Sequence, residues 1–279
     1  MWSFHSPKVR AMSDVLTLGD QHLPLGEVTY VMGVINLSPD SKNLPTVAHS
    51  VDEALAMADR YRIWGATLID LGGQSSHYEN PTIPVADEIS RVVPTVEALA
   101  AEGHLVSIDT WKPEVAEAAV TAGAVIVNDT GGLQDPEMRR VVADLEVPVV
   151  VVHVEGDNPH NLAPLDLAED KAERTANRLR RLLADLAAEG IRDVIVDPGI
   201  ALNYPSDYEA YTRMQLQVIA ASEQLKALGR PVLIPIPRKR DAHRVAAYIS
   251  LALEHKADLI RVHDVALACD LARLFGRSR

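Results

Sequence analysis

The sequence lacks several common signatures of catalytic and metal-binding chemistry. Cys269 is the single cysteine among 279 residues, so no disulfide can form within the chain and no set of thiolate ligands exists. No histidine and cysteine cluster has the spacing of a zinc site, and neither a GxSxG elbow nor a GxGxxG turn after the first predicted strand occurs. The single cysteine favours a reducing compartment.

Long apolar runs and aromatic residues are also scarce. No stretch reaches the ~18 consecutive apolar residues of a membrane span, and residues 1–14 contain no long apolar segment. We therefore expect a cytoplasmic protein with no membrane contact and a flexible N-terminus over residues 1–14. Aromatic residues make up 4% of the chain, so the core must be packed mostly from small aliphatic side chains.

Positive charge is in short supply as well. The chain has 27 Lys and Arg residues against 39 Asp and Glu residues, a formal net charge of −12, which argues against nucleic acid as a partner. The stretch Pro231–Arg240 (PVLIPIPRKR) therefore stands out, because an apolar run ends in Arg238, Lys239 and Arg240. A buried strand ending in cations indicates an anionic ligand; a strand followed by the polar first turn of a helix is the alternative interpretation.

Apolar runs alternate with helical patterns along most of the chain. The runs are Val28–Asn36, Ala66–Gly72, Leu105–Thr110, Ala124–Thr130, Pro148–Val154, Asp193–Gly199, Pro231–Pro237 and Asp258–Asp264. Helical spacing occurs over Val51–Trp64, Ala86–Ala101, Pro113–Ala122, Leu165–Glu189, Tyr208–Leu228, His243–His255 and Ala266–Phe275. Before the first run, Val15–Gly26 has the pattern of a β-hairpin around Gly19 and Asp20.

This alternation predicts an α/β protein with a (β/α)8 TIM barrel over residues 15–279, folded as a single domain with the N-terminal hairpin closing one end. A doubly wound open sheet is the alternative. Against it, the first strand lacks a GxGxxG turn, and nothing in the sequence indicates a break into two domains.

Polar residues follow or end every predicted strand. They are Asn36, Asp70, Asp109, Asn128 with Asp129, His153, Asp197, Lys239, and Arg261 with His263 and Asp264. One such residue commonly caps the next helix. Eight in register at the C-terminal ends of barrel strands indicate a functional site instead.

Two groups of these residues suggest different ligand chemistries. Asp109, Asn128 and Asp197 offer acceptors for ring and amino N–H groups, which suits a flat heterocycle with an amidine-like edge. The residues of the last two strands, Lys239, Arg261 and His263, suit a phosphate or pyrophosphate. The side-chain oxygen of Asn36 would then be a neutral ligand of a Mg²⁺ ion that also binds phosphate oxygens.

Seven ordered blocks resemble the dihydropteroate synthase family, whose members join p-aminobenzoate to a pterin methyl pyrophosphate and release pyrophosphate. The blocks are MGVIN-x-SPDS (Met32–Ser41), IDLGGQSS (Ile69–Ser76), SIDTWK (Ser107–Lys112), IVND (Ile126–Asp129), DPGI (Asp197–Ile200), RK (Arg238 and Lys239) and RVHDV (Arg261–Val265). The resemblance covers the chain from about Val28 to its end.

The resemblance implies a TIM barrel that binds a pterin-like small molecule, forms a homodimer and uses Mg²⁺ with the pyrophosphate. It also implies a role for each matching residue: a pterin pocket of Ser76, Asp109, Asn128, Asp197 and Lys239, contacts to ring and pyrophosphate from Arg261 and His263, and a magnesium ligand in Asn36.

The loops that receive p-aminobenzoate in the family differ here. Lys42, Asn43 and Leu44 occupy a first loop from which an aromatic residue, an acidic residue and two glycines of the family pattern are missing. His77 replaces an arginine of the second loop, and Arg240 replaces the serine that meets the aminobenzoate carboxylate. Because loops that surround a substrate need backbone freedom and polar groups at the reacting centre, these changes predict little or no synthase activity.

Four functions are therefore open from the sequence. The first is a diverged, inactive paralogue that keeps the pterin and pyrophosphate pocket, with aminobenzoate analogues as further candidate ligands. The second is an active dihydropteroate synthase of folate biosynthesis whose loops differ in sequence. A pterin methyltransferase of the methyltetrahydrofolate type is the third. Against it, that reaction involves no pyrophosphate for cations such as Lys239 and Arg261 to bind. A non-catalytic scaffold is the fourth.

Overall fold

The fold is a barrel of eight parallel strands. A computed structural model of the chain describes residues 15–41, 44–77, 79–167, 170–238 and 241–279. The strands hydrogen-bond in the order β10-β7-β6-β5-β4-β3-β12-β11. Their bounds are β3 (Tyr30–Asn36), β4 (Leu68–Gly72), β5 (Leu105–Asp109), β6 (Ile126–Asp129), β7 (Val149–Val152), β10 (Val194–Asp197), β11 (Leu233–Pro235) and β12 (Leu259–Val262). A parallel bridge between Val196 and Val232 joins the two ends of the sheet. The predicted TIM barrel is confirmed, and each predicted apolar run contains one of these strands.

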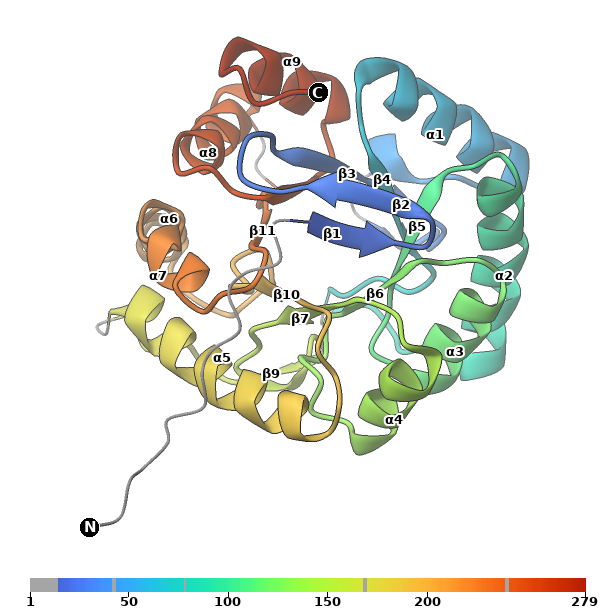
Figure 1. Ribbon diagram of the computed structural model, residues 1–279, viewed down its shortest axis with the longest axis horizontal. Coiled ribbons are helices and arrows are strands. Elements are labelled where there is room, and N and C mark those ends of the chain that lie inside the picture. The colour runs from blue at the N-terminus through green and yellow to red at the C-terminus, as the bar shows by residue number, and fades with distance from the viewer. Residues whose placement is uncertain (1–14, 42–43, 78, 168–169, 239–240) are drawn as a thin grey trace.

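Helices form a ring around the barrel (Figure 1). They are α1 (Val51–Trp64), α2 (Val85–Ala101), α3 (Pro113–Thr121), α4 (Pro136–Leu145), α5 (Lys171–Ala188), α6 (Tyr208–Ala220), α7 (Ser222–Lys226), α8 (Ala242–Glu254) and α9 (Val265–Leu274). The sequence did not predict α4, and the single helix predicted over Tyr208–Leu228 is two helices, α6 and α7. Within the described ranges, no helix combines the length and apolar character of a membrane span.

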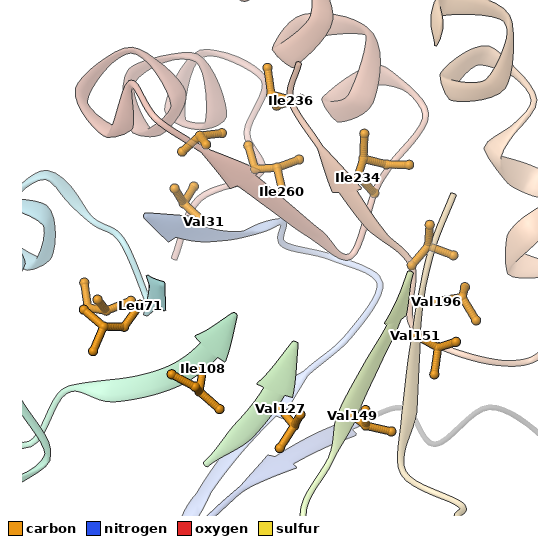
Figure 2. Packing of buried hydrophobic residues seen from close by; sticks show 14 of the residues in the cluster. Val31, Leu71, Ile108, Val127, Val149, Val151, Val196, Ile234, Ile236 and Ile260 are labelled. Atoms are coloured by element: carbon orange, nitrogen blue, oxygen red, sulfur yellow. The ribbon is translucent and has the colours of Figure 1, made fainter. Parts of the chain in front are cut away.

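The strands bury two different cores because alternate side chains point to opposite faces. The outward-facing residues, such as Leu71, Ile108 and Val127, pack against the helices (Figure 2). The inward-facing residues, such as Leu68 and Ile126, form a second apolar cluster inside the barrel. Burial on both faces explains why these strands are nearly continuous apolar runs in the sequence.

The N-terminal hairpin closes the end of the barrel at which the strands begin. It consists of β1 (Val15–Leu18) and β2 (Gln21–Pro24), with Gly19 in a left-handed conformation (φ 53°) in the two-residue turn. Figure 1 shows the hairpin lying across the barrel axis. Leu18 is fully buried and belongs to the same apolar cluster as the inward-facing strand residues. The prediction that the hairpin closes one end is confirmed.

Truncation of the buried hairpin residue Leu18 should destabilise the whole barrel. We expect Leu18→Ala to lower the free energy of unfolding by about 2–5 kcal/mol, because it removes a fully buried side chain and leaves a cavity. Thr17→Ala changes an exposed residue of the same strand and should stay within about 0.5 kcal/mol of the wild type. Urea unfolding measures the free energy of unfolding of both variants. If Leu18→Ala lowered it no more than Thr17→Ala, the hairpin would not contribute to the core.

Candidate functional site

The interior of the barrel changes from apolar to polar along the strands. In β6, the inward-facing Ile126 is followed two residues later by Asn128. The same step leads from Ile195 to Asp197 in β10 and from Leu259 to Arg261 in β12. Because inward-facing residues recur every second position, the strands themselves place a layer of polar side chains at the C-terminal end of the barrel.

Arg261 is at the centre of this layer. Its Nε donates to Asp70 Oδ2 at 2.5 Å, and its Nη2 donates to Asp109 Oδ2 at 2.6 Å. The other oxygen of Asp70 accepts from Ser107 Oγ at 2.7 Å and from Asn128 Nδ2 at 3.2 Å. One guanidinium therefore joins β12 to β4 and β5 across the barrel interior.

Asp70 and Ser107 were not predicted as site residues. Asp70 is one of the polar strand ends but is not among the residues predicted to bind the pterin or the pyrophosphate, and Ser107 lies in the middle of a predicted strand. The sequence signal that would have revealed them is the alternation of side chains between the two faces of a strand. Ser107 is two residues before Asp109 and so faces the same way, and it pairs in register with Asp70.

The structure brings five of the predicted pterin residues to one pocket: Ser76, Asp109, Asn128, Asp197 and Arg261. Thr130, Val152, Gly199, Ala201, Leu202 and Pro235 complete its lining. Asn128 Oδ1 is buried and has no hydrogen-bond partner in the part of the chain that the structure describes. An unpartnered buried acceptor is costly in a folded protein, so it marks a place where a ligand N–H group would bind favourably.

Asp197 is held in place by the turn that follows it. Its Oδ1 accepts from the backbone N–H of Gly199 at 2.6 Å, while its backbone oxygen accepts from the N–H of His153 at 2.8 Å. Gly199 has a φ of +69°, and a Cβ atom there would lie 1.8 Å from the backbone oxygen of His153. A glycine is therefore required at this position of the DPGI block.

Two carboxyl groups of the pocket have strongly raised pKa values. Burial raises the pKa of Asp197 to about 7 against the lowering effect of its hydrogen bond from Gly199. Burial likewise raises the pKa of Asp109 to about 7, although the charge of Arg261 opposes it. For Arg261, burial lowers the pKa, but the carboxylates of Asp70 and Asp109 outweigh it and the pKa is raised overall. Arg261 therefore stays charged, whereas the two carboxyl groups titrate near neutral pH.

A second polar group lies beside the pocket. Asn36 Nδ2 donates to Thr46 Oγ1 at 2.7 Å, and that oxygen lies 3.4 Å from Nδ1 of His263. Burial, followed by the charges of Arg261 and Arg238, lowers the pKa of His263 to about 3. His263 is therefore neutral at pH 7, and it offers a hydrogen bond to an anion rather than the positive charge that the sequence suggested.

The donor set around Asn36 suits a metal ion that brings most of its own ligands. Among the described residues, no group of three or more His, Cys, Asp and Glu side chains could hold a metal ion. The bond to Thr46 uses the amide nitrogen of Asn36, so Oδ1 is not engaged by Thr46. One neutral oxygen fits Mg²⁺ in a shell completed by water and phosphate oxygens.

The residues predicted from the altered loops are only partly described. Lys42, Asn43, Lys239 and Arg240 lie outside the described residues. Leu44 begins a short 3₁₀ helix, η1 (Leu44–Thr46), and is 73% exposed. His77 lies in the connection between β4 and α2, where its Nδ1 accepts from the backbone N–H of Glu79 at 3.3 Å.

The chain belongs to a family of pterin-binding enzymes. The family model described as "Pterin binding enzyme" matches residues 32–268, which covers the barrel and all the pocket residues named above. Within this family, the relatives that the chain resembles are dihydropteroate synthases. The chain is 31% identical over 258 residues to the dihydropteroate synthase of Bacillus subtilis, with 89% of the chain and 88% of that protein covered.

A longer relative and a solved structure agree with this placement. The chain is 33% identical over 270 residues to a probable bifunctional folylpolyglutamate synthase/dihydropteroate synthase of Haloferax volcanii, covering 92% of the chain and 31% of that protein. The chain thus spans about a third of that relative's length. The structure of Xanthomonas albilineans dihydropteroate synthase in complex with 7,8-dihydropteroate is similar, with a TM-score of 0.77, 32% identity, and 94% of this chain and 97% of that one covered.

The raised pKa of Asp197 predicts a pH dependence of stability. The unfolded carboxyl loses its proton near its usual pKa of 3.8, whereas the folded one keeps it until about pH 7. The folded protein therefore binds more protons between these values, and the free energy of unfolding contributed by this group falls as the pH rises from about 4 to about 7.

Asp197→Asn keeps an acceptor for Gly199 but removes this titration. We expect the variant to lose less stability than the wild type between pH 4.5 and 7.5, by a difference on the order of 2 kcal/mol. Urea unfolding across this range measures it, with Asp52→Asn on the exposed face of α1 as the control. Parallel profiles for Asp197→Asn and the wild type would contradict the assignment.

Proposed function

We propose that the chain binds a pterin pyrophosphate in the pocket at the C-terminal end of the barrel, and that it condenses this ligand with p-aminobenzoate weakly or not at all. The observation that carries the first part is Asn128 Oδ1, which is buried without a hydrogen-bond partner among the described residues; Asn128 lines the same pocket as Asp109 and Asp197. Three acceptors from three strands suit the N–H groups of a pterin ring.

Ionised carboxylates would bind the ring best, because charge-assisted hydrogen bonds are stronger than neutral ones. Since the pKa values of Asp109 and Asp197 are both about 7, a ring that donates N–H groups would favour their charged forms. Lys239, which lies outside the described residues, is the further pterin contact that we propose from the family pattern.

The pyrophosphate would lie on the side of the pocket that β3 and β12 provide. There Arg261 supplies positive charge, and neutral His263 supplies a ring N–H donor. Asn36 would hold a Mg²⁺ ion, which when bound neutralises charge on the pyrophosphate oxygens. Arg261 now pairs with Asp70 and Asp109, so binding of the ring at Asp109 would release one of its N–H groups for the anion.

The proposal of weak or absent turnover rests on the loops. The first loop lacks the aromatic residue and glycines of the family pattern. His77 replaces an arginine that helps to close the site in the family, and Arg240 replaces a serine that meets the aminobenzoate carboxylate there. His77 is occupied locally by Glu79, and its shorter side chain cannot reproduce the forked donors of an arginine. Loss of polar groups that act at a charge-developing step commonly costs about 10²–10³ in rate each.

An active dihydropteroate synthase is the second candidate. It is supported by the alignment over 88% of the Bacillus subtilis enzyme and by the similarity to a structure that holds 7,8-dihydropteroate, which joins both halves of the reaction in one ligand. Under this alternative, the altered loops would perform the same chemistry with different side chains.

Binding and turnover must be measured separately. We expect calorimetry with 6-hydroxymethyl-7,8-dihydropterin pyrophosphate and Mg²⁺ to show binding, and Asp197→Asn to weaken it about 10- to 100-fold through loss of a charged hydrogen-bond acceptor. Asp52→Asn is the matched control and should bind like the wild type. An absence of binding to the wild-type chain would contradict the pterin pocket.

Turnover is then followed by pyrophosphate release in the presence of p-aminobenzoate. We expect little or none above the uncatalysed reaction. Turnover at an ordinary enzymatic rate, on the order of 1 per second or faster, would reject the proposed inactivity and establish the second candidate.

A further inference from the structure

His160 connects two segments that lie far apart in the sequence. It lies in the turn of the short hairpin formed by β8 (Gly156–Asn158) and β9 (Asn161–Leu162), within the long connection from β7 to α5. Its Nε2 lies 2.8 Å from the backbone oxygen of Ser75, and its Nδ1 lies 3.1 Å from Oγ1 of Thr82. Both ring nitrogens therefore contact the connection between β4 and α2.

The partners define the tautomer of the ring. A backbone oxygen can only accept, so Nε2 must carry the hydrogen that it shares with Ser75. In the neutral ring, Nδ1 then accepts from the hydroxyl of Thr82. Both nitrogens are thus satisfied without a positive charge on His160.

The ring of His160 is also fixed from its other side. It packs against Trp111, with ring centroids 5.0 Å apart and an angle of 56° between the planes. Trp111 comes two residues after Asp109, at the C-terminal end of β5. In addition, the backbone N–H of His160 donates to Asn158 Oδ1 at 2.9 Å. The position of the imidazole is therefore set by the hairpin and by the strand that carries a pocket carboxyl group.

The hydrogen bond from His160 holds the backbone oxygen of Ser75, the residue directly before a pocket residue. Ser76 lines the pocket together with Asp109 and Asn128. At its stem, the same connection is held by the buried Lys112, whose Nζ donates to Gln74 Oε1 at 2.6 Å and to the backbone oxygen of Ile83 at 2.7 Å. Lys112 thus fixes the two ends of the connection, and His160 fixes the segment between them that carries Ser76.

We propose that His160 is a positioning residue that holds Ser75 and Ser76 beside the pterin pocket in the ligand-free protein. By fixing this segment before the ligand arrives, it reduces the conformational entropy that binding would otherwise have to offset. The identity of the ligand rests on the proposed function above, whereas the positioning of the segment does not.

A set of substitutions separates the contacts of His160. His160→Ala removes both hydrogen bonds and the contact with Trp111. His160→Gln places an amide nitrogen near the position of Nε2 and so can still donate to Ser75, and Thr82→Val removes only the hydroxyl that meets Nδ1. His160 is half-buried and lies outside the barrel core, so the melting temperature of each variant should stay near that of the wild type.

Hydrogen exchange of the ligand-free protein tests the positioning directly. The backbone N–H groups of His77, Asn80 and Ile83 are hydrogen-bonded within the β4–α2 connection and serve as reporters. We expect His160→Ala to speed their exchange about tenfold while strand β5 is unaffected, and His160→Gln to restore most of the protection. Unchanged exchange in His160→Ala, or failure of His160→Gln to restore protection, would overturn the proposal.

Ligand binding provides the functional readout. For 6-hydroxymethyl-7,8-dihydropterin pyrophosphate with Mg²⁺, we expect the Kd of His160→Ala to rise about tenfold and that of His160→Gln to stay within about threefold of the wild type. An unchanged Kd in His160→Ala would overturn the link from positioning to the site. If the wild type itself fails to bind, the proposed function fails, and the exchange experiment still decides whether His160 positions the segment.

Discussion

The pairing of Arg261 with Asp70 and Asp109 is the interaction on which the site depends. Carboxylates inside a barrel lose their hydration, a cost that only a close cation and well-directed hydrogen bonds offset. Arg261 provides both at 2.5 and 2.6 Å and links β12 to β4 and β5. Its position keeps a polar layer stable above an apolar interior, and that layer lines the pocket.

The barrel could be predicted from the sequence because strands buried on both faces are apolar runs, and all but one of the runs are followed by a helical pattern. Helix α4 (Pro136–Leu145) escaped prediction because no apolar pattern of that length was recognised there, although Asp135 and Pro136 form a normal helix start. Asp70 escaped as a site residue because its importance depends on Arg261, 191 positions away in the chain. The alternation of side chains along the strand shows which way Asp70 faces, but it does not identify Arg261 as the partner.

The two parts of the site are built from different kinds of structure. The proposed ring acceptors Asn128 and Asp197 lie on strands, where the barrel fixes their direction. His77, a described residue of the altered second loop, lies in the connection between β4 and α2, where a sequence can change without disturbing the core. Such a division explains how a chain can keep the features of a pterin pocket while its loops depart from the family pattern. The contacts of His160 also show that the β4–α2 connection is held by the β7–α5 connection and not by the barrel alone.

The central claim is that buried carboxyl groups with pKa values near 7 bind the N–H edge of a pterin ring. The most direct test is the number of protons exchanged when 6-hydroxymethyl-7,8-dihydropterin binds at pH 7, measured by calorimetry in buffers of different ionisation enthalpy. Because burial raises the pKa values of Asp109 and Asp197 toward neutrality and N–H donors favour the ionised carboxylates, the account predicts a net release of protons when the ring binds. Binding without net proton release would contradict it.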